Sequence, residues 1–208
     1  MNNLDVKQQI TTLANSYKAN LSNQIYKRKN EMKSDNLDHY VLYNALGISD
    51  SQGFDIDLYQ NIGRFLYKYA GAFLEDAAKI CFVDKFGVDN AKKVYVPNIV
   101  DSSPKKFEID CLVNNHLGIE LKWRDATTDG DHKNKEHKRV KSVFAAGYKP
   151  IRVMFYKPNR RQSIKIQTGI RAIYESLGGE YYAGADAFNY VKEITGIDLL
   201  EIITSIKY

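Results

Sequence analysis

The sequence predicts a mixed α/β fold, in which a small mixed β-sheet is flanked by helices and preceded by extra N-terminal helices. Helical spacing of apolar residues dominates the chain up to residue 86, short strand-like segments follow, and a helical pattern then alternates with one more strand. A chain of 208 residues fits one domain with a sizeable core. We expect a single domain with a helical N-terminal region (1–50), a core (54–156) and C-terminal helices (157–208).

The first predicted elements are helices. Residues 4–33 form a long polar helix with a narrow apolar stripe, and residues 38–46 form a short one. Residues 57–86 have the clearest helical pattern, because apolar residues return on one face over the whole segment and Gly87 ends it.

Strand patterns begin near residue 93. The segment 93–100 contains Pro97, which limits it to a sheet edge or a bulge. Residues 107–113 and 118–123 form two more strands, joined by a turn at 114–116.

Side chains alternate between the two faces of a strand, and this sorts the residues of the two central strands. The apolar face of the first strand is predicted to hold Phe107, Ile109, Cys111 and Val113. Asp110 then points the opposite way, and Glu120 and Lys122 share one face of the second strand. If the strands pair, these three charged side chains converge.

The remaining elements are predicted in the order turn 127–130, helix 132–146, strand 151–156, helix 161–177 and two short helices within 185–206. The helix at 132–146 connects the strand at 118–123 to the strand at 151–156. The handedness rule for such crossovers predicts that these two strands are parallel.

Asp110, Glu120 and Lys122 form a candidate site because two carboxylates beside an amine can hold a divalent cation and orient a water molecule. Phosphodiester hydrolysis needs this combination. The plain alternative is an amphipathic hairpin whose solvent face carries these charges. Apolar residues flank each charged one, and buried charges need partners or a metal, so we favour a site.

Glu75 is a further candidate, within Gly71-Ala72-Phe73-Leu74-Glu75-Asp76-Ala77-Ala78. Small neighbours let a helix approach a sheet closely, so Glu75 could reach the same site. The alternative is a surface ion pair with Lys79 one helical turn later.

The net charge of +5 is unevenly distributed. Residues 137–174 contain ten Lys and Arg and no Asp or Glu, so the total of +5 leaves −5 for the other 170 residues. A basic block of this kind is typical of a protein with a polyanionic partner, although a solvated face would have the same composition. We favour the polyanion because the block directly follows the acidic motif.

Cys81 and Cys111 both fall in apolar patterns, which favours buried thiols in a reducing cytosol over a disulfide. The chain shows no apolar leader and no apolar run that approaches about 18 residues, so we expect neither secretion nor membrane insertion.

The segment Ile109-Asp110, nine intervening residues and Glu120-Leu121-Lys122 resembles the active-site motif of the PD-(D/E)XK nuclease superfamily, which includes many type II restriction endonucleases. Ile109 replaces the usual proline, which coordinates nothing. The chain is similar, more narrowly, to the ApaLI-like restriction endonucleases in the segments Gly63–Gly71, Phe107–Cys111, Lys122–His132 and Gly147–Arg152.

This resemblance implies a restriction-endonuclease-like core and a catalytic set of Asp110, Glu120, Lys122 and Glu75. Asp110, Glu120 and the backbone carbonyl of Leu121 would bind Mg²⁺. Lys122 would orient or activate the attacking water and stabilise charge on the phosphate, with Glu75 as an auxiliary acid.

The activity implied is that of a Mg²⁺-dependent, homodimeric type II restriction endonuclease in the cytoplasm of a bacterial cell. It would cut double-stranded DNA at a palindrome, GTGCAC for the narrower family, and leave 5′-phosphate and 3′-hydroxyl ends. A cognate methyltransferase would belong to the same system. Three alternatives stay open: a structure-selective nuclease such as a junction resolvase, a DNA-binding protein that does not cut, and a structural protein.

DNA contacts are expected from the helix at 132–146, the loop before it and the segment after Pro158, because these lie beside the predicted site in sequence. The candidate residues are Asp129, His132, Lys133, Lys135, Arg139, Lys141, Arg160 and Arg161.

Overall fold

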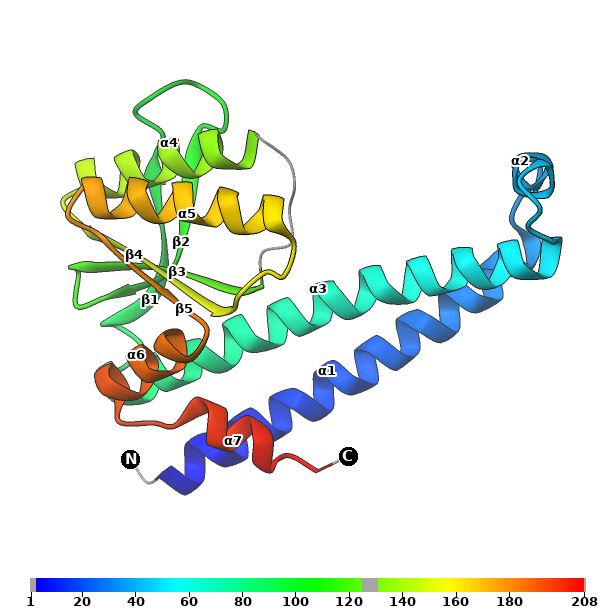
Figure 1. Cartoon of the computed structure of the whole chain (residues 1–208). Coiled ribbons are helices and arrows are strands. Elements are labelled where there is room, and N and C mark those ends of the chain that lie inside the picture. The colour runs from blue at the N-terminus through cyan, green and yellow to red at the C-terminus, as the bar shows by residue number, and fades with distance from the viewer. Residues whose placement is uncertain (1–2, 125–130, 208) are drawn as a thin grey trace. The chain divides into compact units, whose positions relative to one another are not determined.

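The computed structural model describes residues 3–124 and 131–207, with side chains from Val6 onward and, after the gap, from Lys133 onward. The elements, labelled in Figure 1, are α1 (Asn3–Glu31), a 3-10 turn η1 (Met32–Ser34), α2 (Tyr40–Ala45), α3 (Asp50–Phe86), β1 (Ala91–Pro97), β2 (Lys106–Val113), β3 (Leu117–Arg124), α4 (Asp131–Ala145), β4 (Lys149–Tyr156), α5 (Arg161–Ser176), β5 (Glu180–Ala183), α6 (Ala185–Thr195) and α7 (Leu199–Ser205). The fold is mixed α/β, as predicted, and every predicted helix is present.

The chain divides into two compact units. The larger consists of Met1–Thr11 and Leu74–Tyr208 and contains the sheet, and the smaller is Thr12–Phe73. Within the smaller unit, the ring of Tyr17 on α1 meets that of Tyr69 on α3 edge-on, with 6.1 Å between the ring centroids. The division of the chain into one core with flanking helical regions stays a prediction.

The sheet has five strands in the order β1-β2-β3-β4-β5. The first two pairings are antiparallel and the last two are parallel, so the sheet is mixed. The predicted parallel crossover between β3 and β4 is confirmed, and Pro97 lies on the edge strand β1, also as predicted.

The sequence analysis missed β5. This strand is only four residues long, and every one of them is partly buried, so no alternation marks it in the sequence. Its strand conformation comes from parallel pairing with β4, from Ile151↔Glu180 to Met154↔Ala183. That pairing partner lies about 30 residues away and is invisible to a local pattern.

Helices cover both faces of the sheet in the larger unit. Figure 1 shows α4 and α5 together on one face, with α6 and the C-terminal part of α3 on the other. Val143 of α4 packs on apolar side chains of β1 and β2, and Val140 of α4 packs with Ile170 and Tyr174 of α5. The crossover helix α4 is therefore held by both the sheet and its neighbouring helix.

The predicted apolar face of β2 is wrong at its N-terminal end. Phe107 and Ile109 belong to the same buried cluster as Leu112, although strict alternation would place Ile109 and Leu112 on opposite faces. The pairing with β1 explains this, because Lys92 is opposite Leu112 whereas Val94 is opposite Ile109. An advance of two residues along β1 therefore corresponds to three residues along β2, so β2 has a β-bulge at Asp110–Cys111.

Both cysteines are free and buried, as expected, and burial raises the pKa of each thiol to about 12. Within the described residues, no helix has both the length and the apolar character of a membrane span.

Gly179, just before β5, provides a test of the β4–β5 contact. A Cβ added there would overlap the carbonyl oxygen of Pro150 and lie 3.0 Å from that of Tyr174. Gly179→Ala should therefore lower the free energy of unfolding by about 1–3 kcal/mol, measured by urea denaturation with far-UV circular dichroism. Gly63→Ala is the matched control in α3, where nothing lies within 4 Å, and it should raise stability by about 0.5–1 kcal/mol. Equal effects of the two changes would contradict the close approach at β5.

Candidate active site

Asp110 lies at the bulge of β2, where its side chain takes the place of a backbone hydrogen-bond acceptor for β3. Backbone pairing between β2 and β3 joins residues 111–113 to residues 117–119. Beyond that point the Oδ2 atom of Asp110 accepts the backbone N–H of Leu121, at 2.8 Å. The bulge therefore turns a buried carboxylate toward β3, where it borders the Glu120-Leu121-Lys122 segment.

Lys122 joins the acids of this site. Its Nζ atom is 2.9 Å from Glu120 Oε1 and 3.7 Å from Asp110 Oδ2, and it donates a hydrogen bond to the carbonyl of Leu121 at 2.9 Å. The structure thus brings together the three charged side chains that strand alternation and pairing predicted to converge.

Glu75 of α3 also reaches this group. Its Oε1 atom is 3.5 Å from Lys122 Nζ, and Gly71 and Ala78 beside it on the helix are buried. Burial raises the pKa of the Glu75 carboxyl, the charge of Lys122 opposes this rise, and the charge of Asp110 adds to it. The expected alternative partner, Lys79, forms its ion pair with Asp76 instead.

A buried network on α4 extends the site. Arg139 forms an ion pair with Glu120 Oε1, and the same Nη1 atom is 3.1 Å from Glu136 Oε1. The other oxygen of Glu136 accepts a hydrogen bond from Arg152 at 2.8 Å and a longer one from Tyr174 at 3.4 Å. Burial lowers the pKa of the Arg139 guanidinium.

Glu136, Arg152 and Tyr174 were missed by the sequence analysis. One signal was available, because Arg152 interrupts an otherwise apolar strand, and a charge in such a strand needs a buried partner. Glu136 is one of two acids in a basic helix and lies three residues before Arg139, on the same helical face. The pairing of β3 with β4 places Glu120 directly opposite Arg152, which brings the two groups of residues together.

The cluster combines a buried floor with an open side. Asp110 and Glu120 are 7% and 5% exposed, whereas the side chains of Lys122 and Glu75 are 28% and 26% exposed. Four carboxylates (Glu75, Asp110, Glu120 and Glu136) face three cationic groups (Lys122, Arg139 and Arg152), so the fully ionised cluster has a net charge of −1. A negative, partly open cluster of this kind attracts a cation.

The donor atoms at this cluster match the preference of Mg²⁺. Among the residues that the structure describes, no three His, Cys, Asp or Glu side chains form a group that could hold a metal ion. Mg²⁺ commonly uses only one or two carboxylates and keeps several waters, so Asp110, Glu120 and the Leu121 carbonyl are a fitting oxygen set. In the structure these oxygens are bound by Lys122, by Arg139 and by the N–H of Leu121.

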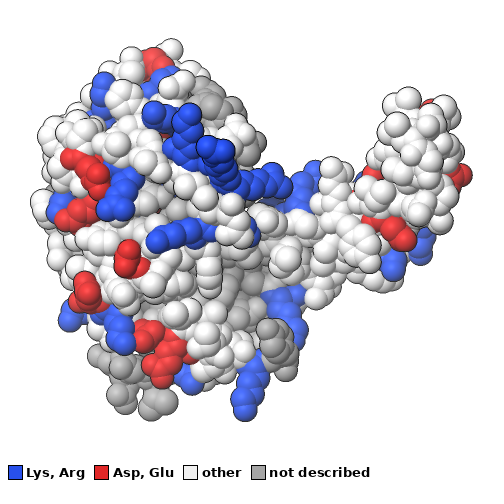
Figure 2. All heavy atoms as spheres, in the orientation of Figure 1, with Lys and Arg blue, Asp and Glu red and all other residues white. Residues whose placement is uncertain are grey.

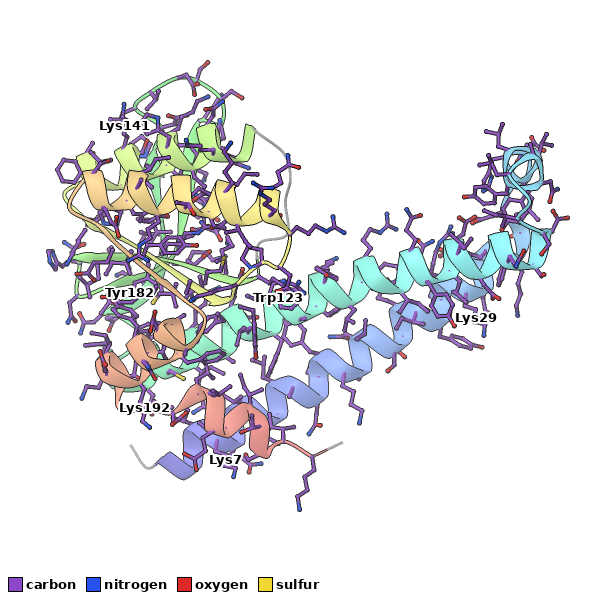
Figure 3. The ribbon with its side chains drawn as sticks, in the orientation of Figure 1. Lys7, Lys29, Trp123, Lys141, Tyr182 and Lys192 are labelled. Carbon is purple, nitrogen blue, oxygen red and sulfur yellow. The ribbon has the colours of Figure 1, made fainter. Side chains whose placement is uncertain are left out.

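The predicted DNA-contact residues occupy different environments. Those exposed to solvent are Lys133, Lys135, Lys141 (Figure 3), Arg160 and Arg161. Asp129 and the predicted turn at 127–130 lie outside the described residues, as does the side chain of His132. The side chain of Arg139 is only 16% exposed and is bound to two acids, so it lies inside the protein, whereas the others lie on its surface.

The basic block at 137–174 is only partly a solvated surface. Half of its ten basic residues pair with acids outside the block, in the pairs Lys138–Asp101, Arg139–Glu120, Lys149–Glu180, Arg152–Glu136 and Arg171–Glu175. Basic side chains gather instead over the N-terminal halves of α4 and α5 (Figure 2). Exposed residues there include Lys133, Lys135, Arg160, Arg161 and Lys165.

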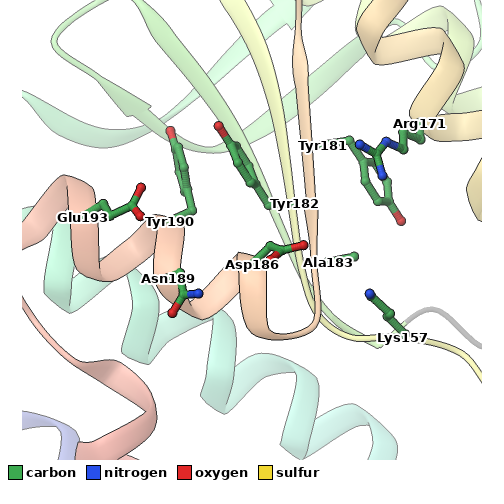
Figure 4. Close-up of a pocket in the computed structure, with 9 residues that line it drawn as sticks. All are labelled: Lys157, Arg171, Tyr181, Tyr182, Ala183, Asp186, Asn189, Tyr190 and Glu193. Carbon is green, nitrogen blue, oxygen red and sulfur yellow. The ribbon is translucent and has the colours of Figure 1, made fainter.

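A separate cavity of about 310 Å³ lies beside β5 and α6 (Figure 4). The rings of Tyr182 and Tyr190 stack at one side, with 4.3 Å between their centroids. Lys157, Arg171 and Asp186 also line it, whereas none of the acids around Lys122 does.

Comparison with known proteins gives one family match. Residues 1–208 match the family model described as ApaLI-like restriction endonuclease. No curated protein matches the chain, and no solved structure matches it. The five-stranded mixed sheet with flanking helices is consistent with a restriction-endonuclease-like fold.

Glu75 and Glu108 should affect stability in opposite directions. The raised pKa of Glu75 means that its ionisation weakens the fold as the pH rises above the ordinary glutamate value. The pKa of Glu108 is lowered by hydrogen bonds from Lys93 and Tyr95, so its contribution is present at neutral pH and is lost as the pH falls. In EDTA at about pH 7.5, Glu75→Gln should raise the urea midpoint and Glu108→Gln should lower it, and both differences should shrink near about pH 4. Shifts of the same sign at neutral pH would contradict the two assignments.

Proposed function

Because its whole length matches that family, the chain belongs to the ApaLI-like restriction endonucleases, and we propose that it hydrolyses double-stranded DNA at one short palindrome with Mg²⁺. Membership of a restriction endonuclease family makes the protein a DNA-cleaving hydrolase. The proposal adds the metal, the site residues and the products, which are 5′-phosphate and 3′-hydroxyl ends. One observation carries it: a single lysine lies within 4 Å of three carboxylates from a helix and two strands.

We propose that Asp110, Glu120 and the Leu121 carbonyl bind Mg²⁺. The ion lowers the pKa of bound water and offsets charge that builds on the phosphate. Asp110 is suited to this role because its other contact, the N–H of Leu121, fixes the carboxylate against β3. Glu120 is fixed from two sides, by Lys122 and by Arg139. We propose that these residues form the superfamily motif PD-(D/E)XK.

Lys122 is the proposed group that contacts the reacting atoms. Its side-chain nitrogen donates hydrogen bonds to the attacking water and to a phosphate oxygen, and the three neighbouring carboxylates hold it in position. Glu75 assists by holding Lys122 from the helix side. The attacking water gives one proton to solvent as its oxygen forms the new bond to phosphorus. The bond between phosphorus and the 3′ oxygen breaks, and that oxygen takes a proton from solvent to become the 3′-hydroxyl.

The proposed DNA surface is formed by the exposed basic residues of α4 and α5. Arg160 and Arg161 precede or begin α5, and Lys133 and Lys135 lie in the first turns of α4. The side chain of Lys133 also lies against Gly169 of α5, so the two helices present their basic residues side by side. Such contacts bind phosphates and position the duplex.

A palindromic site has two-fold symmetry, so we propose a homodimer in which each subunit cuts one strand. The site proposed from the family is GTGCAC, protected in the host by a cognate methyltransferase. The two buried free thiols fit a reducing bacterial cytoplasm.

The direct experiment is to incubate the protein with phage DNA and Mg²⁺ and to sequence the ends. Discrete fragments that all end within one hexamer support the proposal, and GTGCAC ends support the narrower one. Cleavage of branched DNA without discrete plasmid fragments would assign a structure-selective nuclease instead. EDTA should stop cleavage and added Mg²⁺ should restore it.

Isosteric changes test the metal-binding acids. Asp110→Asn and Glu120→Gln should each lower turnover by about 10²–10³-fold or more, because each removes a charge that acts directly at the reacting phosphate. Lys122→Ala should lower turnover more than affinity. DNA affinity, measured in Ca²⁺ by fluorescence anisotropy, should change by less than about threefold in all of them. Glu108→Gln, on the same strand as Asp110, is the control and should cut normally. Full activity of either acid variant would refute the assignment.

Salt dependence tests the proposed DNA surface. Arg160→Ala and Arg161→Ala should each reduce the slope of log affinity against log salt by about 1, because each removes one phosphate contact. Lys192→Ala on α6 is the control, since this lysine pairs with Asp198, the N-cap residue of α7. An unchanged slope in both arginine variants would remove this segment from the DNA surface.

A further inference from the structure

Arg139 connects two acids through one nitrogen atom. Its Nη1 contacts Glu120 Oε1, which belongs to the proposed metal site, and also Glu136 Oε1 at 3.1 Å. Its buried Nε has no hydrogen-bond partner among the described residues. The guanidinium therefore contacts both acids through Nη1, and a small movement of the side chain is enough to shift it from Glu120 to Glu136.

Glu136 is positioned to bind the Arg139 guanidinium without the help of Glu120. Its side chain is 2% exposed, and its second oxygen is held by Arg152 and Tyr174. Arg152 is itself completely buried and lies opposite Glu120 across the β3–β4 pairing. Glu136 therefore stays in place, whichever acid Arg139 binds.

Arg139 occupies an oxygen that a metal ion would use. Glu120 Oε1 is bound by both Lys122 and Arg139, so its charge is already balanced in the structure. A divalent cation that binds through this oxygen competes with both contacts. Lys122 keeps two other acids nearby, and Arg139 keeps Glu136, so neither cation is left buried without a partner.

We propose that Arg139 is an internal counter-ion that competes with the divalent metal for Glu120 and moves onto Glu136 when the metal binds. The inference rests on the proposed function, because it takes Glu120 as a metal ligand. It assigns Arg139 a role inside the protein, in place of the DNA contact expected from the sequence. The consequence is that Arg139 weakens metal binding in the free protein.

The sign of this effect separates it from other roles. Removing the charge of Arg139 frees Glu120, so Arg139→Met should tighten Mn²⁺ binding by about tenfold or more. Glu136→Gln removes the acid onto which Arg139 moves, so it should weaken Mn²⁺ binding by a similar factor. Arg139→Lys keeps the charge, and a lysine nitrogen can also bridge two acids, so Mn²⁺ affinity should stay within about threefold of the wild type.

The experiment measures Mn²⁺ affinity by isothermal titration calorimetry on the full-length protein without DNA. Lys138→Met is the matched control, because Lys138 is the neighbouring cation on α4 but pairs with Asp101. Its effect should be below about twofold, which separates direct contact with Glu120 from the general field of the protein. Thermal unfolding of each variant shows which of them are folded.

Other outcomes overturn the inference. Weaker Mn²⁺ binding in both Arg139→Met and Glu136→Gln would indicate that the network only supports the fold. Unchanged Mn²⁺ affinity with weaker DNA affinity and a smaller salt slope in Arg139→Met would assign Arg139 to the DNA surface. If Arg139→Met does not fold, Glu136→Gln and Arg139→Lys decide the question. Mn²⁺ binding weakened about tenfold in Glu136→Gln, with a change below about threefold in Arg139→Lys, supports the inference, and equal changes in the two variants overturn it.

The wild-type protein and Asp110→Asn separate the two proposals. If the wild type binds Mn²⁺ and cuts DNA, and Asp110→Asn does neither, the proposed function stands and the variants test the counter-ion alone. If the wild type neither binds Mn²⁺ nor cuts DNA, the proposed function fails and the counter-ion role fails with it.

Discussion

The burial of several carboxylates close together is the constraint on which this structure depends. Asp110 and Glu120 are almost fully buried and Glu75 is close by, and such a group of carboxylates is stable only with cations among them. Lys122 supplies one cation and Arg139 the other. The open side at Lys122 and Glu75 then leaves a negative cluster that solvent can reach.

The topology follows from this constraint. The antiparallel β2–β3 pair brings two acids together, and the parallel β3–β4 crossover returns through α4 over the same face of the sheet. Because of that crossover, Glu136 and Arg139 of α4 meet Glu120 and Arg152 of adjacent strands. The mixed sheet therefore joins the partly open cluster around Lys122 to a buried ion network, with Glu120 as the shared member.

Sequence reasoning found the parts of the site that depend on local patterns. Alternation and pairing brought Asp110, Glu120 and Lys122 together, and small residues around Glu75 indicated a close helix. It failed where the cause is distant in sequence. The strand β5 exists through its pairing with β4, and the surroundings of Arg139 depend on residues 13 to 19 positions away on two strands. Arg139 in a basic helix looks like a surface residue, and only the fold reveals that Glu120 lies beside it in addition to Glu136.

The bulge in β2 makes the number of residues in this strand more important than the identity of its apolar ones. Phe107 and Ile109 could exchange with other apolar residues and still fill the core beneath α4. Loss of one residue at the bulge would instead restore regular pleating and rotate everything on its N-terminal side by half a turn. Among related chains, substitutions should therefore accumulate at the apolar positions of β2 and spare Asp110, while insertions and deletions collect in the loops at either end.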